Sequence, residues 1–392
     1  MDVDEHNGNV RLREGFHIIN IECRTFRGKD KVSFEVPTRY YDLQYLNAGA
    51  QGTVVSAMDR VTGKSVAIKK MLNACSHPLT ARRAYREFVL LTTMKHPNII
   101  QLLNAFTSTE TVDGFTDIYV VMELMSHNLA EIATRMRLEH RTLSFFVYQM
   151  LCAIKHLHNS GVIHRDLKPS NIVVDDNCKL KVLDFGLARV VNSDPAMRMS
   201  DYVVTRYYRA PEVVLSIPYD EKVDIWSVGC ILAELVNHSV LFEGKDRIDQ
   251  WTRIIKILGT PSEEFINTLG DGVAKYVRQM NHYNPIPVKE FIPDSNFSKE
   301  TELEQVHLTA DQCRDLLAHM LEIDPRRRYS VENALHHPYV KLWWDEAEVN
   351  GPRSENRYNN DVEVEDKPLS AWKSLIFEEI KLYEREHDIF KD

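Results

Sequence analysis

Two short segments of the chain bring together side chains that phosphoryl transfer requires. Residues 164–171 read His-Arg-Asp-Leu-Lys-Pro-Ser-Asn, and residues 184–186 read Asp-Phe-Gly. Transfer of a phosphate needs a hydroxyl aimed at the phosphorus and groups that neutralise the charge spreading over the phosphate. Asp166 can accept a hydrogen bond from such a hydroxyl, and Lys168 can reach the moving phosphate. The pattern therefore indicates transfer of a γ-phosphate from a nucleotide to a hydroxyl.

An amide and a second acid in these segments could hold a metal ion. Asn171 and Asp184 offer the hard oxygen ligands that Mg²⁺ prefers. At these positions the chain resembles the eukaryotic protein kinases. The resemblance implies ATP and Mg²⁺ as cofactors. It also implies a bilobal α+β fold, in which a small antiparallel β-sheet N-lobe carries one main helix and a larger C-lobe is mainly helical.

The composition is that of an ordinary globular chain. It has 392 residues, enough for two lobes with separate cores, and 44% of them are hydrophobic. The formal net charge of −9 argues against a nucleic-acid binder, which usually carries a basic face, and it fits basic protein partners better. Six cysteines are scattered without a CxxC pair, so we expect no disulfide framework, no metal–thiolate site and a reducing compartment.

The sequence shows neither a secretory nor a membrane-spanning pattern. Residues 1–10 are acidic and polar, unlike a secretory signal. The most apolar stretch, Ile225 to Ala233, is far shorter than the roughly 20 residues that span a bilayer. We therefore expect a soluble intracellular protein without a membrane partner, located in the cytoplasm and also able to act in the nucleus.

Changes in hydrophobic periodicity divide the chain into four parts. Residues 1–39 show no strong period and suggest a partly ordered N-terminal extension. In residues 40–122, short β-rich runs and one helical pattern predict an N-lobe of five strands and one helix. Residues 123–340 predict the hinge and a helical C-lobe, with an insertion at about 260–305. Residues 341–392 read as an acidic docking region followed by an amphipathic tail helix.

A glycine-rich segment in the N-lobe could cradle phosphates. Because glycine has no Cβ, the backbone N–H groups of such a loop can approach a phosphate closely. Asn47 replaces the first glycine of the kinase pattern, and asparagine tolerates positive φ better than most residues, so we expect the loop to keep its shape. The residues after Gly52 resemble a strand, which disfavours a dinucleotide-binding loop. The segment consists of Asn47, Ala48, Gly49, Ala50, Gln51 and Gly52.

A lysine and a glutamate of the N-lobe could orient the nucleotide. Lys69 ends the run Val-Ala-Ile-Lys, where it could meet the α- and β-phosphates. Glu87 lies in the predicted helix and could orient that lysine. The plain alternative is a surface ion pair, worth roughly 0–1 kcal/mol. The neighbouring motifs favour the phosphate-binding role.

The resemblance also implies the walls of an adenine pocket. Met122 matches the position that gates the back of the pocket, and Glu123-Leu124-Met125 match the hinge whose backbone binds adenine. Without the flanking motifs, all of these side chains are explained as well by a plain core. The residues that would sandwich the base are Leu46, Val54, Ala67 and Val173.

Several further residues have implied roles in the C-lobe. Kinases that modify serine and threonine carry a lysine at the place of Lys168, so the resemblance implies a Ser/Thr kinase. The activation segment would run from Asp184 to Glu212. A structural ion pair is implied between Glu212 and Arg328, and Asp224 and Trp226 match the helix that braces the catalytic loop.

Two hydroxyl groups of the activation segment resemble a phosphorylation lip. Ser200-Asp201-Tyr202 stands where mitogen-activated protein kinases carry Thr-x-Tyr, before the run Thr-Arg-Tyr-Tyr-Arg. A phosphate adds about −1.5 to −2 charges and three acceptor oxygens, which arginines can bind through charge-assisted hydrogen bonds. The arginines expected to receive the phosphates are Arg86, Arg165 and Arg189 for Ser200, and Arg206 and Arg209 for Tyr202.

The resemblance is closest to the c-Jun N-terminal kinase subgroup and covers residues from about Tyr40 to Glu384. Matching runs include Gly-Ala-Gln-Gly at 49–52, Val-Met-Glu-Leu-Met at 121–125 and Ile-Asp-Gln-Trp at 248–251. The subgroup carries Thr-Pro-Tyr at the lip, so the chain is identified as a divergent member. A role in stress signalling and a preference for serine or threonine followed by proline are implied.

The resemblance also implies a docking surface and protein partners. The family binds basic and apolar peptide motifs on acids opposite the active site, and Asp345, Glu346 and Glu348 stand at the matching place. The alternative for such an acidic run is a solvated surface. The implied partners are an upstream dual-specificity MAP kinase kinase, phosphatases, and substrates such as transcription factors with Ser/Thr-Pro sites and basic docking motifs. Direct binding of nucleic acid is not expected.

A function from another class also fits the sequence. A pseudokinase scaffold would bind partners through the docking groove without transferring phosphate. Pseudokinases typically lose one or more catalytic residues, whereas only Asn47 departs from the pattern here. The retained catalytic set favours an active enzyme and consists of Lys69, Glu87, Asp166, Lys168, Asn171 and Asp184.

Overall fold

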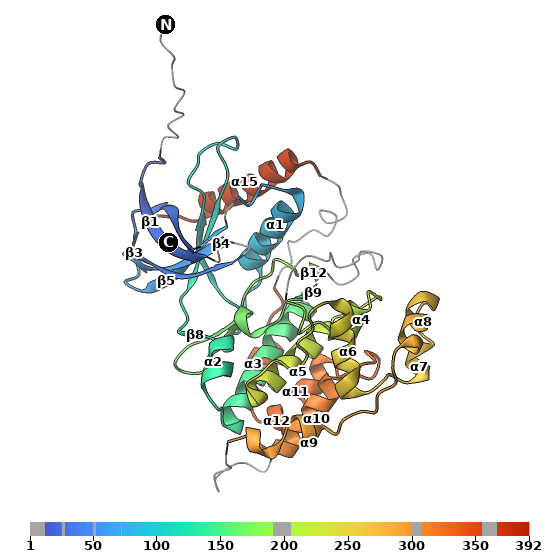
Figure 1. Ribbon diagram of the computed structural model, residues 1–392. Helices are drawn as coiled ribbons and strands as arrows, with labels where there is room; N and C mark the ends of the chain where they lie inside the picture. Colours follow the sequence, from blue (N-terminus) through green and yellow to red (C-terminus); the bar gives the residue numbers. More distant parts are fainter. Residues whose placement is uncertain are drawn as a thin grey trace. The chain divides into compact units, whose positions relative to one another are not determined.

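Antiparallel strands dominate one part of the chain and helices dominate the other (Figure 1). The computed structural model describes residues 12–25, 28–49, 52–71, 73–190, 205–298, 307–354 and 367–391. Unit 1 comprises Met1–Thr92, Ile100–Leu124 and Arg357–Asp392, and unit 2 comprises Thr93–Ile99 and Met125–Asn356. The strand-rich unit 1 and the helical unit 2 correspond to the α+β class that the sequence predicted.

A five-stranded antiparallel sheet in the order β3-β4-β5-β7-β6 forms the centre of unit 1. Val55 and Ala57 of β4 are buried and alternate with partly buried neighbours, so the two faces of the sheet have different surroundings. Gly63, with φ of +65°, forms the turn between β4 and β5, where a left-handed residue is needed. The strands are β3 (Tyr40–Gly49), β4 (Gly52–Asp59), β5 (Ser65–Met71), β6 (Leu102–Phe106) and β7 (Ile118–Glu123), and α1 spans Pro78–Thr93.

A second, two-stranded sheet covers one face of this five-stranded sheet. It consists of β1 (Phe16–Thr25) and β2 (Gly28–Pro37), which pair from Phe16↔Pro37 to Thr25↔Gly28. Phe34 and Val36 of β2 share one buried cluster with Val55 and Ile68 of the larger sheet. The expected partly ordered extension therefore contains a hairpin that completes the core of unit 1.

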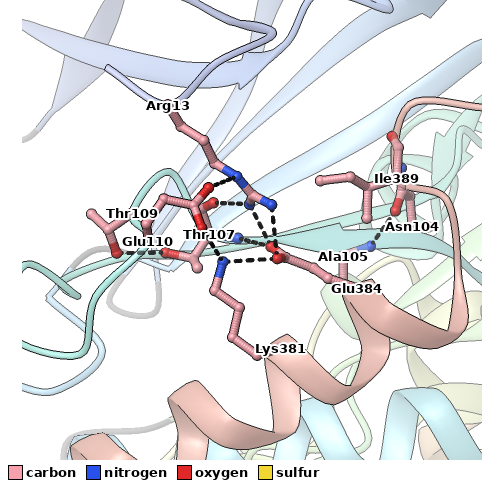
Figure 2. Close-up of polar contacts among 9 residues, drawn as sticks. All are labelled: Arg13, Asn104, Ala105, Thr107, Thr109, Glu110, Lys381, Glu384 and Ile389. Atoms are coloured by element: carbon pink, nitrogen blue, oxygen red, sulfur yellow. Dashed lines mark hydrogen bonds and ion pairs between the residues drawn. The ribbon is translucent and has the colours of Figure 1, made fainter. Parts of the chain in front are cut away.

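Residues from both ends of the chain meet beside this core (Figure 2). The Arg13 guanidinium donates to both carboxylate oxygens of Glu384, at 2.7 and 3.0 Å. The Nε atom of Arg13 lies 2.5 Å from Glu110 Oε1, and Lys381 Nζ lies 2.9 Å from Glu384 Oε2. The buried Asn104 side chain donates to the carbonyl oxygen of Ile389 at 2.9 Å. The hairpin and the chain's last residues are thus held to the same sheet.

The tail helix α15 (Leu369–Glu386) packs against α1 within unit 1. Tyr85 of α1 lies 5.9 Å from Trp372 between ring centroids, and Phe88 lies 6.2 Å from Tyr383. Trp372 is fully buried. The amphipathic stripe predicted from the sequence is therefore a packing face.

Unit 2 is built around the long buried helices α3 (His140–Asn159) and α5 (Lys222–Asn237). Its short strands form a β11-β10-β8 sheet and a β12-β9 pair. These strands are β8 (His127–Asn128), β9 (Val162–Ile163), β10 (Ile172–Val174), β11 (Leu180–Val182) and β12 (Arg189–Val190). The other helices are α2 (Leu129–Arg135), η1 (Pro169–Asn171), α4 (Pro211–Val214), α6 (Arg247–Leu258), α7 (Glu263–Ile266), α8 (Asp271–Gln279), α9 (Val288–Phe291), η2 (Asp294–Asn296), α10 (Ala310–Met320), α11 (Val331–Leu335), α12 (Pro338–Lys341) and α13 (Glu346–Val349).

A buried ion pair joins two distant segments of unit 2. Arg328 donates to Glu212 through Nη1 at 2.6 Å and Nη2 at 2.9 Å, and both side chains are 0% exposed. The Arg328 guanidinium also lies over the Trp226 ring. The predicted Glu212–Arg328 pair is confirmed, and it ties the start of α4 to the loop after α10.

The insertion that the sequence placed at about 260–305 contains the short elements α7, α8, α9 and η2. All six cysteines are free thiols. Within the ranges given above, the helices are too short or too polar to cross a membrane.

Candidate functional site

The catalytic loop begins directly after β9 and is held by one buried carboxylate. Asp224 of α5 accepts hydrogen bonds from the backbone N–H groups of His164, at 2.9 Å, and Arg165, at 2.8 Å. Arg165 has φ of 65°, a left-handed conformation that a non-glycine residue adopts only when its surroundings hold it there. Asp224 thus performs the bracing role that the sequence assigned to it.

A histidine on α3 keeps that carboxylate in its charged form. Asp224 is fully buried, which alone would raise its pKa. The hydrogen bond from His158 Nε2 at 2.9 Å and the backbone N–H donors outweigh burial, so the pKa of Asp224 lies below its usual value. His158 was not predicted as a functional residue, because its role depends on Asp224, which lies 66 positions away in the sequence.

The side chain of Asp166 has one engaged oxygen and one open oxygen. Lys168 Nζ donates to its Oδ2 atom at 2.8 Å, and Asn171 Nδ2 donates to the same atom at 3.1 Å. No described residue donates a hydrogen bond to Oδ1. Burial raises the pKa of Asp166, opposed by Lys168 and assisted by the nearby Asp184. Oδ1 is therefore available to a substrate hydroxyl, on a carboxylate more basic than a solvated aspartate.

Asn171 and Asp184 present oxygen atoms that suit a hard cation. Because the amide nitrogen of Asn171 is used by Asp166, its Oδ1 atom remains as an acceptor. Asp184 has φ of 65°, and its Oδ1 atom accepts from Gly186 N at 3.1 Å. In the described ranges no group of three or more His, Cys, Asp or Glu is arranged to hold a metal. The two residues fit Mg²⁺ as part of a ligand set that phosphate oxygens and water would complete.

Lys69 and Glu87 form a close ion pair within unit 1. Lys69 Nζ lies 2.6 Å from Glu87 Oε1, and the side chains are 11% and 5% exposed. Strand register places Val54 opposite Lys69 and Ala67 opposite Met122, so these four residues share one face of the sheet. This face is opposite the one that the β1–β2 hairpin covers. The proposed phosphate and adenine contacts of unit 1 therefore gather on one surface.

The glycine-rich segment joins β3 to β4. Gly52 has φ of +139°, and a Cβ atom there would lie 2.0 Å from the Lys70 carbonyl oxygen, so only glycine fits. Asn47 lies in extended β3, and its Oδ1 atom accepts a hydrogen bond from Ala48 N at 2.8 Å. It is not among the residues with positive φ, so the conformational reason expected for asparagine was wrong. Ala50 and Gln51 lie outside the described residues.

The remaining residues that the sequence predicted to line an adenine pocket belong partly to unit 1 and partly to unit 2. Leu46 is 46% exposed and lies at a register irregularity of β3. Glu123 ends β7, and its side chain accepts from Gln101 N at 2.9 Å. The division between the units falls between Leu124 and Met125, inside the expected hinge. Val173 belongs to β10 of unit 2.

Comparisons with known proteins decide the family. A model described as protein kinase domain matches residues 40–340. The chain is 60% identical over 390 residues to GLH-binding kinase 1 of Caenorhabditis elegans. This alignment covers 100% of both chains. This chain belongs to the protein kinase family. It is 49% identical over 352 residues to stress-activated protein kinase jnk-1 of the same nematode, covering 90% of this chain and 74% of the relative.

A further relative narrows the subgroup. Stress-activated protein kinase JNK of Drosophila melanogaster is 47% identical over 352 residues, covering 90% of this chain and 93% of that protein. The chain is therefore a JNK-like member of the mitogen-activated protein kinases, which are Ser/Thr enzymes with ATP as their substrate. The resemblance stated from the sequence motifs is confirmed.

The two hydroxyl-bearing residues predicted to be regulatory, Ser200 and Tyr202, lie outside the described residues. Arg86 belongs to α1 of unit 1. Arg165 donates through Nε to Leu187 O at 2.7 Å and through Nη1 to Tyr219 OH at 2.6 Å, so it already has partners. Sequence reasoning missed Tyr219, which no motif marks.

The other proposed phosphate receivers also lie in unit 2. Arg189 is in β12 and pairs with Ile163, just before the catalytic loop. Arg206 and Arg209 line one cavity together with Arg247 of α6. The sequence analysis did not single out Arg247, since it is remote from the lip in sequence.

Of the three acids of the expected docking region, Asp345 directly precedes the short helix α13, and Glu346 and Glu348 lie within it. Asp345 caps this helix, accepting from Ala347 N at 2.8 Å and Glu348 N at 3.2 Å. Glu346 accepts from the Trp344 indole and the Asn350 amide. Glu348 accepts from Tyr148 OH at 3.1 Å. Each acid thus has a local structural role. A docking role, if present, would be additional to it.

Proposed function

We propose that the chain is an active kinase that transfers the γ-phosphate of ATP to serine or threonine followed by proline, in stress signalling. The observation that carries this proposal is the open Oδ1 atom of Asp166, on a carboxylate whose other oxygen Lys168 and Asn171 hold. A scaffold that transfers no phosphate does not need a carboxylate arranged in this way.

The chain's own residues suit the transfer. Asp166 Oδ1 would accept the hydrogen bond of the substrate hydroxyl and then its proton, and the raised pKa of Asp166 favours this transfer. Lys168, already bound to Oδ2, keeps a positive charge beside the position where negative charge develops. Lys69, oriented by Glu87, would hold the α- and β-phosphates.

Mg²⁺ is part of this proposal. The oxygens of Asn171 and Asp184 would hold it, and a bound Mg²⁺ supplies charge neutralisation to the phosphate oxygens. Asp166 helps to orient Asn171, because the amide donates to both its backbone and side-chain oxygens, at 2.9 and 3.1 Å. One aspartate therefore serves both the hydroxyl and the metal ligand.

Activation would require phosphate on Ser200 and Tyr202, placed there by an upstream dual-specificity MAP kinase kinase and removed by phosphatases. Arg165 is the preferred receiver for Ser200, because it lies beside Asp166 in the catalytic loop and could exchange its hydrogen bonds to Leu187 and Tyr219 for contacts with a phosphate. A phosphorylated lip would in this way act on the loop that carries the catalytic aspartate.

The protein partners and the cellular location of this kinase are proposed from its family resemblance. Asp345, Glu346 and Glu348 would bind basic docking motifs of substrates such as transcription factors, and the kinase would act in the cytoplasm and the nucleus. A relative that is 60% identical is named for binding GLH, so a protein of that kind is a proposed partner.

The lip is tested with the purified full chain after treatment with an activating kinase. A Ser200→Ala, Tyr202→Phe double variant should lose at least about 90% of the gain in activity toward a Ser-Pro peptide, since no phosphate can order the segment. Thr134→Val, a change at an exposed hydroxyl of α2, serves as the control. Full activation of the double variant would reject the proposed switch.

A further inference from the structure

The cavity that contains Arg206 and Arg209 has a third arginine that comes from another element. Arg206 and Arg209 lie in the loop before α4, and Arg247 is the first residue of α6. All three line one cavity of about 230 Å³. This volume is below the roughly 300–1,000 Å³ of sites for drug-sized ligands, so the cavity suits a small group.

Neutral groups, not carboxylates, hold two of these guanidinium groups in place. Arg206 Nη1 donates to the carbonyl oxygen of Lys245 at 3.1 Å, and Arg247 Nε donates to the carbonyl oxygen of Val214. Neither side chain forms an ion pair with another described residue. A backbone carbonyl orients a guanidinium but leaves its charge uncompensated, so two positive charges of this cavity have no counter-ion within the described ranges.

The cavity has a fixed wall. Gln250 is fully buried, donates to the carbonyl oxygen of Phe242 at 3.0 Å and accepts from Gly244 N at 3.1 Å. A Cβ atom at Gly244 would lie 2.5 Å from Gln250 Cα, so the loop before α6 is packed tightly against that helix. Asp246, the nearest acid in sequence, uses its side chain to cap α6 by accepting from Asp249 N at 2.9 Å. The position of Arg247 is therefore set by packing.

We propose that Arg247 is a third phosphate-binding residue of this cavity and that the cavity binds an aryl phosphate monoester through three guanidinium groups. Arginine suits this ligand because its planar fork makes paired hydrogen bonds to phosphate oxygens. The inference rests on the proposed function for its natural ligand, the phosphate of Tyr202. Arg206 follows Tyr202 by four positions, and such a segment spans at most roughly 14 Å.

A cavity with three arginines would protect the phosphate on Tyr202 but not the phosphate on Ser200. A phosphate on Tyr202 that is enclosed by Arg206, Arg209 and Arg247 would be poorly accessible to a phosphatase, and Arg247 would slow its removal. Ser200 has other receivers, so Arg247 should not affect the removal of its phosphate. We therefore predict that Arg247 slows the removal of phosphate from Tyr202 and leaves its removal from Ser200 unchanged.

The first experiment measures the rate at which a tyrosine phosphatase removes phosphate from Tyr202 in the full chain, with mass spectrometry reporting Ser200 and Tyr202 separately. Arg247→Gln should speed the loss of phosphotyrosine about tenfold, as expected for one charge-assisted contact. Arg247→Lys should fall between wild type and Arg247→Gln. Lys256→Gln, an exposed cation on the same helix, should match wild type. Equal rates for wild type and Arg247→Gln would overturn the proposal, even if Arg206→Gln speeds the reaction.

The second experiment is independent of the activating kinase. Phenyl phosphate is titrated into the unphosphorylated full chain, and its ³¹P line width is followed. Wild type and Lys256→Gln should broaden the signal, whereas Arg247→Gln should not, and the chain phosphorylated on Tyr202 should not because its cavity is filled. If the activating kinase leaves Tyr202 unmodified, the proposed function fails and this titration alone decides the role of Arg247. If Arg247→Gln broadens the signal as much as wild type does, the proposed role of Arg247 is overturned. If the chain phosphorylated on Tyr202 also broadens the signal, Tyr202 is rejected as the source of the phosphate that fills the cavity.

Discussion

Lys168 Nζ lies 2.8 Å from Asp166 Oδ2, and this contact determines which oxygen of Asp166, the proposed catalytic aspartate, remains open. Asn171 donates to the same oxygen at 3.1 Å, so two donors hold one side of the carboxylate and leave Oδ1 without a described partner. Because Lys168 and Asn171 follow Asp166 within five positions, one short loop supplies both the proposed base and the residues that orient it.

Loss of the Lys69–Glu87 ion pair should lower activity without unfolding the protein. Glu87→Gln removes the charge that orients Lys69 at 2.6 Å, so phosphotransfer should fall by roughly 10²-fold, the cost typical of losing one preorganised electrostatic contact. Steady-state kinetics toward a Ser-Pro peptide, with ATP varied, would measure this. Lys64→Met, a change in the exposed β4–β5 turn, is the control. Activity within twofold of wild type in Glu87→Gln would show that Lys69 does not need its partner.

A test of the proposed docking acids needs substitutions that preserve helix α13. Asp345→Asn keeps a capping side chain while removing its charge, and Glu348→Gln keeps an acceptor for Tyr148. If these acids bind basic motifs, the double variant should raise the apparent KM for a substrate with a docking motif about fivefold, since exposed charge pairs contribute about 1 kcal/mol. The KM for a short peptide should not change. Glu290→Gln, an exposed acid elsewhere in unit 2, is the control, and equal effects on both substrates would reject the docking role.

The Glu212–Arg328 pair should matter for stability rather than chemistry. Arg328→Met leaves a carboxylate that is 0% exposed without its charged partner, so the free energy of unfolding should fall by roughly 3–5 kcal/mol. The Glu212→Gln, Arg328→Met double variant removes the unpaired charge and should recover part of that loss. Denaturant titrations of the two variants and of the exposed control Arg327→Met would measure the difference. A double variant no more stable than Arg328→Met would contradict the explanation by an unpaired charge.

A pair of histidines in unit 2, one of them buried, should make stability depend on pH. His96 and His156 lie 4.9 Å apart between ring centroids, and burial followed by the charge of His96 lowers the pKa of His156 from 6.5 to about 4. Between these two values the unfolded chain binds a proton that the folded chain refuses, so stability is lost as pH falls from 6.5 toward 4. From about pH 7.5 to about pH 5 this loss should reach roughly 2 kcal/mol.

The variant His156→Asn tests this dependence by denaturant unfolding at the same two pH values. It should lose most of the change that wild type shows, and what remains would reflect His96, whose pKa is also lowered by burial. His282→Asn replaces an exposed histidine and should behave as wild type. An unchanged pH dependence in His156→Asn would exclude His156 as its source.

The sequence predicted the five-stranded sheet and α1 because alternation and β-branched runs are local signals. It missed the hairpin β1–β2, since Phe34 and Val36 become buried only when they pack on Val55 and Ile68, far away in the sequence. A two-stranded hairpin is marginal by itself, so its own residues carry a weak signal. The attachment of Arg13 to Glu384 is equally non-local.

The candidate site was predictable wherever a motif lies in one short segment. Asp166, Lys168 and Asn171 were found together for this reason, as was the brace Asp224. Arg247 was not, because only the fold brings the start of α6 to the loop that holds Arg206.

The most direct test of the account is a phosphotransfer assay with the purified, activated full chain, using a Ser-Pro peptide, a Ser-Ala peptide and Asp166→Asn as the blank. We predict transfer to the Ser-Pro peptide, much weaker transfer to the Ser-Ala peptide, loss of activity after phosphatase treatment, and a fall of roughly 10²–10⁴-fold in Asp166→Asn. Wild-type activity no higher than that of Asp166→Asn would contradict the account and favour a scaffold that transfers no phosphate.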